Sequence, residues 1–160
     1  MANLGKTSEA ENEQKAFRDL VAKSPPDEMY DMLNTRGAVY KIHDNMLAGA
    51  IAHAHKDDNA AIDLLKQAIA AEDALSYSEP PAWYPPVRPT LGRLLLAINR
   101  ASEAEKVFRE DLDRAARDAR ALSGLRDALK AQGRNYEADQ VDQQFRSAWK
   151  VAGAANASQR

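Results

Sequence analysis

Three stretches of this chain repeat one spacing of small residues, and that repetition constrains the fold more than any other feature. In each stretch a residue pair precedes an alanine by 12 residues: Ala48-Gly49 before Ala61, Leu91-Gly92 before Ala104, and Leu125-Arg126, with arginine in the place of glycine, before Ala138. The alanines of the last two stretches are 34 residues apart, whereas those of the first two are 43 apart. A period of this length is typical of proteins built from stacked pairs of antiparallel helices.

The repeated small residues have a physical explanation in helix packing. Two antiparallel helices joined by a short turn approach closely only where both carry small side chains, which predicts Gly49 against Ala61 and Gly92 against Ala104. Large residues one turn further along, Leu65 and Phe108, would then fill the groove against the next helix pair. A helical bundle that simply has alanine at its crossings is the alternative explanation.

Composition supports an all-α fold. Of the 160 residues, 44% are hydrophobic, 29% are charged and only 6% are aromatic, and much of the hydrophobic share is alanine, a strong helix former. This length is enough for one domain with a core. The absence of cysteine excludes disulfides and thiolate chemistry.

Breaks in the helical pattern divide the chain into three parts. Residues 1–26 form an acidic N-terminal arm or helix, from Ser8 to about Lys23, that is either frayed or docked. Residues 27–152 form the repeat domain, in which the pattern is already helical from Asp27, with a possible break at Gly37. Residues 153–160 are small and polar, which predicts a disordered tail. Whether residues 102–123 form one continuous helix stays open.

A proline-rich insertion interrupts the repeats at residues 76–89. Five of the seven prolines lie between Pro80 and Pro89. Prolines this dense exclude a helix and favour an extended, polyproline-like segment. The nine extra residues between the first two repeats coincide with this insertion.

On these residues the chain resembles the tetratricopeptide-repeat family. More narrowly, it is similar to the C-terminal portion of a group of long bacterial tetratricopeptide proteins of undefined function. The narrower resemblance lies in Met46-Leu47-Ala48-Gly49, the segment from Ala74 to Tyr84 with its Glu-Pro-Pro-x-Trp-Tyr motif, Val87-Arg88, Leu91-Gly92, Ala104-Glu105 and Gly124-Leu125. It implies about three tetratricopeptide-type repeats stacked as a short solenoid, and a non-enzymatic scaffold that binds a protein or peptide.

The chain also departs from that group. Its relatives carry histidine-rich segments upstream and commonly a C-terminal end that contains cysteine, and neither is present here. A metal or redox role attached to those parts cannot be transferred to this chain.

Tetratricopeptide grooves are lined by first-helix residues that face the concave side. By repeat position, the resemblance implies that the groove residues of this chain are His53, Arg93, Leu96, Arg120, Asp127 and Lys130. Arg120 also falls in a possible basic row with Arg114 and Arg117, at helical spacing. Such a row would attract an acidic peptide or simply aid solubility.

The aromatic residues of the insertion allow two interpretations. Trp83 and Tyr84, together with Arg88, are either a surface that recognises a partner or, in the case of the rings, a plug for a hydrophobic gap that the insertion widens between repeats.

No motif for catalysis, for a cofactor or for a metal ion is found. His53 and His55 are two residues apart and so point about 200° apart on a helix, while His43 lies nearly three turns away. No serine-centred elbow, phosphate loop or His-Glu-x-x-His pattern occurs. An enzyme or metal-binding accessory therefore remains only a distant alternative.

The expected partner is a protein or a peptide. The net charge of −2 and the lack of aromatic residues interleaved with basic ones argue against nucleic acid. A homodimer is an alternative, because Phe145 and Trp149 form an apolar stripe that a second copy would cover. No stretch is apolar enough for a membrane span and no signal peptide is visible, which predicts a cytoplasmic protein; a chain whose leader had been removed would look identical.

Overall fold

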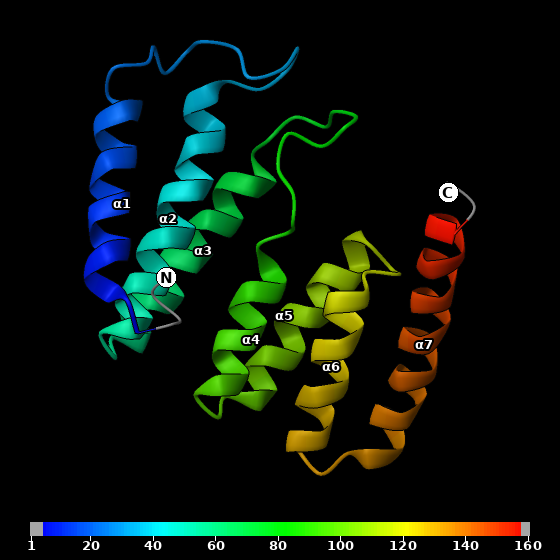
Figure 1. The fold of residues 1–160 in the computed structure, drawn as a ribbon. Helices are drawn as coiled ribbons and strands as arrows, with labels where there is room; N and C mark the ends of the chain where they lie inside the picture. The colour runs from blue at the N-terminus through cyan, green and yellow to red at the C-terminus, as the bar shows by residue number, and fades with distance from the viewer. Residues whose placement is uncertain (1–4, 158–160) are drawn as a thin grey trace. The chain divides into compact units, whose positions relative to one another are not determined.

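The computed structural model describes residues 5–157, and these residues form seven α-helices and no strand (Figure 1). The helices are α1 (Thr7–Val21), α2 (Arg36–Ala54), α3 (Asp58–Asp73), α4 (Arg88–Ala97), α5 (Ala101–Arg114), α6 (Ala119–Ala131) and α7 (Asn135–Ala157). The all-α prediction is confirmed. In the described part of the chain, no helix is both long and apolar enough to cross a membrane.

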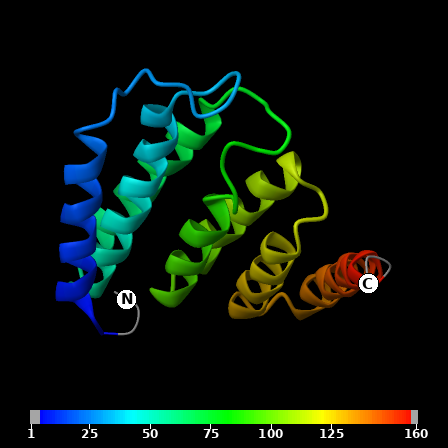
Figure 2. The ribbon, with the colours of Figure 1, turned by 45° about the horizontal axis from the view of Figure 1, so that its top comes forward.

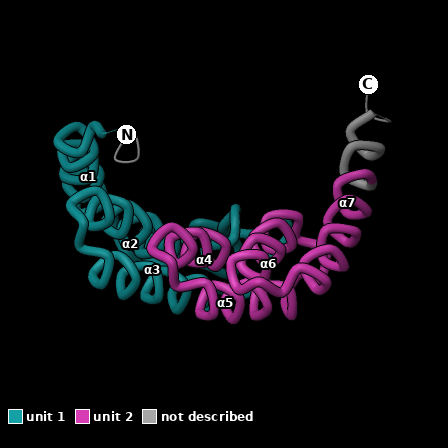
Figure 3. The backbone as a smooth tube through the Cα atoms, turned by 90° about the horizontal axis from the view of Figure 1, so that it is seen from below, with its two compact units in different colours: residues 1–87 teal, residues 88–160 magenta. Residues whose placement is uncertain are grey.

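The chain divides into two compact units, residues 1–87 and residues 88–160, coloured separately in Figure 3. Unit 1 contains α1, α2 and α3 with the two long connections that follow α1 and α3. Unit 2 contains α4 to α7, joined by short turns.

In unit 1, α2 is the central helix and packs against α1 on one side and α3 on the other (Figure 2). Gly49 of α2 lies against Ala61 and Leu65 of α3, as the repeat spacing predicts: a Cβ at Gly49 would lie 3.3 Å from the Ala61 carbonyl oxygen. The N-terminal helix is docked rather than frayed, because Ala10 of α1 is buried against Ile51 of α2.

Polar contacts fix the rest of the interface between α1 and α2. The Asp44 carboxylate on α2 accepts hydrogen bonds from Gln14 at 3.1 Å and from Arg18 at 2.7 Å. At the other end of α1, Glu11 lies 2.6 Å from the His55 imidazole. This docking places the next face of α1, which carries Glu13 and Phe17, beside α2.

Two boundaries in unit 1 differ from the sequence prediction. The first helix begins at Thr7 rather than at Ser8 and ends at Val21 rather than near Lys23, and its N-cap residue Lys6 makes no side-chain capping bond. The helix predicted from Asp27 begins only at Arg36, where the Thr35 hydroxyl accepts a hydrogen bond from the Ala38 amide. The pattern of Met29, Met32 and Leu33 suggested a helix, but capping by Thr35 and local bonds of Asp31 hold these residues in a loop.

In unit 2, one aromatic ring occupies the space that glycines leave open. Phe108 of α5 is fully buried, and its ring contacts Gly92 of α4 and Gly124 of α6 so closely that a Cβ at either position would overlap it. The nearest neighbour of Gly92 is thus Phe108 rather than the predicted Ala104. The predicted filling of the groove by Phe108 against the following helix is observed.

Unit 2 also shows that residues 102–123 are not one helix. The chain leaves α5 after Arg114, and the Asp118 carboxylate caps α6 by accepting hydrogen bonds from the amides of Arg120 and Ala121. Arg114 ends α5, Arg117 lies in the connection and Arg120 lies in α6, so the predicted basic row does not share one helix face. Residues 153–157, predicted as tail, continue α7, and residues 158–160 lie outside the described part.

Candidate functional site

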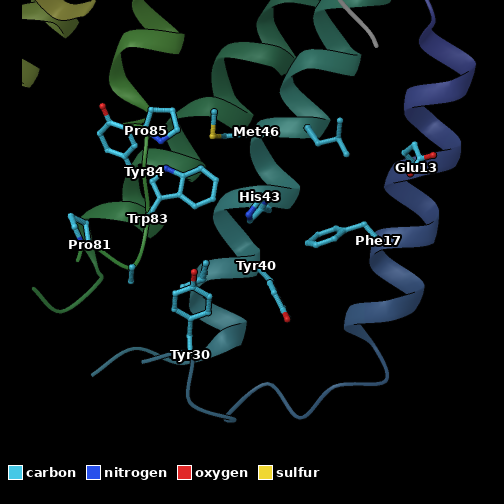
Figure 4. A pocket seen from close by; sticks show the side chains of 13 residues that line it. Glu13, Phe17, Tyr30, Tyr40, His43, Met46, Pro81, Trp83, Tyr84 and Pro85 are labelled. Carbon is cyan, nitrogen blue, oxygen red and sulfur yellow. The ribbon is translucent and has the colours of Figure 1, made fainter. Parts of the chain in front are cut away.

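The described residues of unit 1 form a pocket of about 850 Å³ between α1, α2 and the proline-rich segment (Figure 4). This volume lies within the range of roughly 300–1,000 Å³ typical of ligand pockets. Its lining is Glu13, Phe17, Tyr30, Val39, Tyr40, His43, Met46, Leu47, Pro81, Ala82, Trp83, Tyr84 and Pro85.

Aromatic rings make up the walls of this pocket, which we call the aromatic pocket. His43 and Trp83 meet edge to face, with ring centroids 4.6 Å apart and planes at 90°. Phe17 and Tyr40 meet in the same manner at 5.8 Å and 84°, and Phe17 also lies 5.8 Å from the His43 ring. Figure 4 shows the Phe17 ring reaching from α1 toward His43, with Trp83 on the opposite side of that imidazole.

Each wall is fixed by a different part of the sequence. Glu13 and Phe17 are four residues apart on α1 and therefore lie on one face of that helix. Tyr40 and His43 are three apart on α2, and Met46 follows after three more, which puts the three side chains on a common face of α2. The third wall is not helical and needs its own anchors.

The proline-rich segment is held at both ends. The Ser76 amide donates to the Asn34 side chain at 2.7 Å, and the Asn34 amide group donates back to the Ser76 carbonyl at 2.9 Å. The Ser78 hydroxyl donates to Asp31 at 3.0 Å. At the far end, the Val87 amide donates to the Glu72 carboxylate on α3 at 3.1 Å. Trp83 lies between these anchors.

The loop before α2 takes part in the same arrangement. The Asp31 carboxylate accepts hydrogen bonds from the amides of Leu33 and Asn34, both at 2.7 Å, as well as from Ser78. Hydrogen bonds from Asn34 and Leu33 lower the pKa of Asp31 from 3.8 to about 2. The loop that carries Tyr30 into the pocket is therefore tied to the segment that carries Trp83.

The charge of the pocket comes from one side chain at neutral pH. Among the described residues that line it there is no lysine or arginine, and Glu13 is the one carboxylate. Partial burial lowers the pKa of His43 below its usual 6.5, so this imidazole is neutral at pH 7. The pocket is therefore apolar with a single negative charge.

The Trp83 indole nitrogen is buried in the pocket wall without a hydrogen-bond partner. A buried N–H that lacks an acceptor costs roughly 1–3 kcal/mol. Figure 4 shows this nitrogen on the edge of the ring that lies toward Tyr84 and Pro85. Because this nitrogen is buried, a ligand carbonyl would reach it only after the atoms that cover it moved.

Of the three residues predicted to form the surface of the insertion, only Tyr84 is exposed to a large degree. Trp83 packs on His43, whereas Tyr84 is exposed while also lining the pocket. Arg88 is buried, with 8% of its surface exposed, at the first residue of α4, so it does not present a charge on the insertion.

The residues predicted to line a groove are divided between the two units. His53 lies 2.6 Å from the Asp58 carboxylate, across the turn from α2 to α3. In unit 2, Arg93 of α4 donates to the Ser123 hydroxyl of α6 at 3.3 Å and lies 3.8 Å from the Asp127 carboxylate. Leu96 on α4, and Arg120 and Lys130 on α6, complete the predicted set, with both basic residues exposed.

Sequence reasoning missed most of the aromatic pocket. It identified Trp83 and Tyr84 but not Phe17, Tyr40 and His43. The spacing of Tyr40, His43 and Met46 was a usable signal, because it marks an aromatic face on α2. The position of Trp83 over that face depends on the anchors at Asn34 and Asp31, which no sequence pattern indicated.

Within the described residues, no group of three or more histidine, aspartate or glutamate side chains could hold a metal ion. The three histidines also have different contacts: His53 pairs with Asp58, His55 pairs with Glu11, and His43 packs against aromatic rings.

Comparison with protein-family models, with curated proteins and with solved structures gave no match to this chain.

Proposed function

We propose that this protein is a non-enzymatic binding module, built from about three tetratricopeptide-type repeats, that takes up an extended apolar peptide segment in the aromatic pocket. The observation that carries the proposal is the pocket itself: an apolar space of about 850 Å³ walled by rings from α1, α2 and the proline-rich segment. Aromatic-lined clefts are a common means of binding extended peptides.

The repeat assignment is supported by how small residues are used. Gly49 admits Leu65 and Gly92 admits Phe108 at positions that the 12-residue spacing marks, and Gly124, which lies two residues before the third marked position, also admits Phe108. In α2–α3, α4–α5 and α6–α7, consecutive helices pack as pairs. A bundle with incidental alanine crossings would not need the same spacing three times.

Preorganisation supports binding rather than structural plugging. Asp31 accepts a hydrogen bond from Ser78, and Asn34 exchanges two with Ser76, so the loop before α2 and the proline-rich segment are tied together and a ligand would not have to order them. Interactions that fix a site before binding raise affinity because less conformational entropy is lost. Rings that only filled a gap in the fold would leave no open space beside them, whereas a pocket of about 850 Å³ remains beside these rings.

A binding role without catalysis is favoured by the polar groups in the pocket. Glu13 and His43 are its acid and its imidazole, and among the described residues neither forms a hydrogen bond with the other. An acid–base pair would need such contact or a shared reacting atom.

The proposal is tested by calorimetric titration with a neutral peptide that contains proline and leucine. We expect a dissociation constant in the micromolar range, and a loss of about tenfold or more for Trp83→Ala, because buried aromatic anchors dominate such interfaces. Tyr136→Ala is the matched control, since Tyr136 is an exposed aromatic on α7 outside the pocket. Equal affinity of the two variants would exclude the aromatic pocket as the site.

A second candidate is the face shared by α4 and α6 in unit 2, where Arg93, Ser123 and Asp127 come together. This is part of the groove that the repeat positions imply. Arg93→Glu combined with Lys130→Glu would change its charge without removing core contacts. If peptide affinity falls with this variant and not with Trp83→Ala, the α4/α6 face is the binding site.

Self-association is a third candidate, favoured by one exposed ring. Trp149 of α7 is 64% exposed and stacks on Phe145, with ring centroids 6.0 Å apart. A second copy that covered this ring would produce a dimer. Light scattering at tens of micromolar, comparing the natural chain with Trp149→Glu, decides: identical monomeric masses rule the dimer out.

A further inference from the structure

We propose that the peptide bound in the aromatic pocket is a proline-containing segment with a basic residue, whose positive charge meets Glu13. This inference rests on the proposed peptide-binding function and adds the class of ligand. It follows from the charge of the pocket, from the geometry of its walls and from the position of Glu13.

Glu13 is available to a ligand. Its side chain is exposed, and within the described residues it forms no ion pair, in contrast to its neighbours on α1. Glu9 is paired with Lys6 at 3.3 Å, and Glu11 contacts His55 at 2.6 Å. Among the acids of α1, Glu13 and Asp19 form no ion pair within the described residues, and of these two only Glu13 lines the pocket.

No described residue that lines the pocket carries a positive charge that would repel a cation. The lining contains no lysine or arginine, and the lowered pKa of His43 keeps that imidazole neutral at pH 7. Ring faces also attract cations, by up to about 2 kcal/mol where water is excluded. An acidic peptide would bring its charge to Glu13 and to the negative faces of these rings.

The walls suit an extended segment better than an isolated side chain. Phe17 with Tyr40 and His43 with Trp83 meet nearly at right angles, and the Phe17 and His43 planes are tilted by 42°, so the rings present surfaces in several orientations along the pocket. Proline-rich segments present their rings on regular faces and keep their backbone carbonyls free of internal hydrogen bonds. Docking of such segments on aromatic-lined grooves costs little entropy because the chain is already extended.

In Figure 4, Glu13 lies beside Phe17 on α1, whereas Trp83, Tyr84 and Pro85 lie on the far side of His43. The ligand would therefore place its proline residues on the rings of Trp83, His43 and Phe17. Its basic side chain would lie toward α1.

The test uses the fluorescence of Trp83. The chain has two tryptophans, so the variant Trp149→Phe leaves Trp83 as the one reporter, and it lies in the pocket wall. Three capped ten-residue peptides share a Pro-x-x-Pro core and differ at one flanking position, which is arginine, glutamine or glutamate. Each is titrated into the full chain at low salt.

We expect the arginine peptide to bind about threefold more tightly than the glutamine peptide, and about tenfold more tightly than the glutamate peptide, as exposed ion pairs typically allow. Added salt should shrink these ratios. Glu13→Gln should abolish the preference for the arginine peptide over the glutamate peptide. Glu9→Gln, on the same helix but outside the pocket, should preserve the preference.

Two results would overturn the inference, and they differ in what they say of the proposed function. Equal affinity for the three peptides, or a preference that survives Glu13→Gln, contradicts the role of Glu13 and leaves peptide binding standing. Failure of all three peptides to change Trp83 fluorescence, together with no heat of binding in the calorimeter, contradicts the proposed function itself. Circular dichroism of each variant confirms that its helices are intact.

Discussion

The two units use their aromatic residues in opposite ways. In unit 2, the Phe108 ring is fully enclosed between Gly92 and Gly124, and no space remains around it. In unit 1, Phe17, Tyr40 and Trp83 line an open pocket and leave their faces partly accessible. Aromatic rings that are fully buried stabilise a fold, whereas rings that border an open space are available to a ligand.

The polar groups differ in the same way. In unit 2, Glu105 is buried and accepts hydrogen bonds from Arg109, Gln132 and Arg134, which join α5 to the turn between α6 and α7. In unit 1, the corresponding network of Asp31 and Asn34 joins two loops rather than two helices. The first network supports the helix packing, and the second shapes a pocket.

The largest expected effect is in the core of unit 2. Phe108→Ala should lower the free energy of unfolding by about 3–5 kcal/mol, because it leaves a cavity between two glycine-containing helices that cannot collapse further. Tyr84→Ala in unit 1 removes an exposed ring and should change stability by less than about 0.5 kcal/mol. Urea unfolding followed by circular dichroism measures both, and equal losses would abolish the contrast between the units.

A steric substitution at Gly124 tests the same contact from the other side. Gly124→Ala places a methyl group inside the space of the Phe108 ring and should cost about 1–3 kcal/mol. Adding Phe108→Leu, which removes the clashing ring atoms, should recover part of that loss. A double variant as unstable as the sum of both single variants would show that the two residues do not share one space.

Glu105→Gln should destabilise unit 2 by about 1–3 kcal/mol, since a neutral amide cannot satisfy Arg134 and Arg109 as the carboxylate does. Burial raises the pKa of Glu105, but hydrogen bonds from Gln132, Arg109 and Arg134 outweigh it and hold the pKa below 4.5. A carboxylate with a lowered pKa stabilises the fold above pH 4.5, and this contribution disappears as the pH falls below that value. Glu105→Gln should therefore flatten the acid limb of a stability curve measured against pH.

The smallest effect on overall stability is expected at Asp31. Asp31→Asn should leave the unfolding midpoint nearly unchanged. It should speed amide hydrogen exchange at Leu33 and Asn34, because the carboxylate accepts hydrogen bonds from both of these amides. The pKa of Asp31 is lowered from 3.8 to about 2, so its contribution is present above pH 4 and lost as the pH falls toward 2. Asp27→Asn, in the same loop, is the control and should leave both exchange rates as they are.

The sequence predicted what depends on local periodicity. Spacing of small residues located the pairings of Gly49 with Ala61 and of Phe108 with the following helix, because close helix crossings require glycine or alanine. The proline-rich segment was correctly excluded from helix up to Val87, since proline cannot donate to a helical ladder, whereas Arg88 and Pro89, predicted as part of the insertion, begin α4, where a first-turn proline is tolerated. These features depend on residues a few turns apart.

What the sequence could not predict depends on contacts across long separations. Residues 27–35 have an apolar spacing that resembles a helix, but Asn34 bonds to Ser76 and Asp31 to Ser78, more than 40 residues away. The same bonds bring Trp83 over His43 and create the aromatic pocket. Arg88 was predicted on the surface of the insertion together with Trp83 and Tyr84, and its burial at the start of α4 has no local signal.

The most direct test of the central claim is to map the binding of the arginine-containing peptide on the isotope-labelled full chain by nuclear magnetic resonance. The account predicts that amide and side-chain shifts change at Phe17, Tyr40, His43 and Trp83 in unit 1. It predicts no change at Arg93, Ser123 and Asp127 in unit 2. Shifts confined to those three residues, with the aromatic pocket unaffected, would contradict the account and place the peptide on the α4/α6 face.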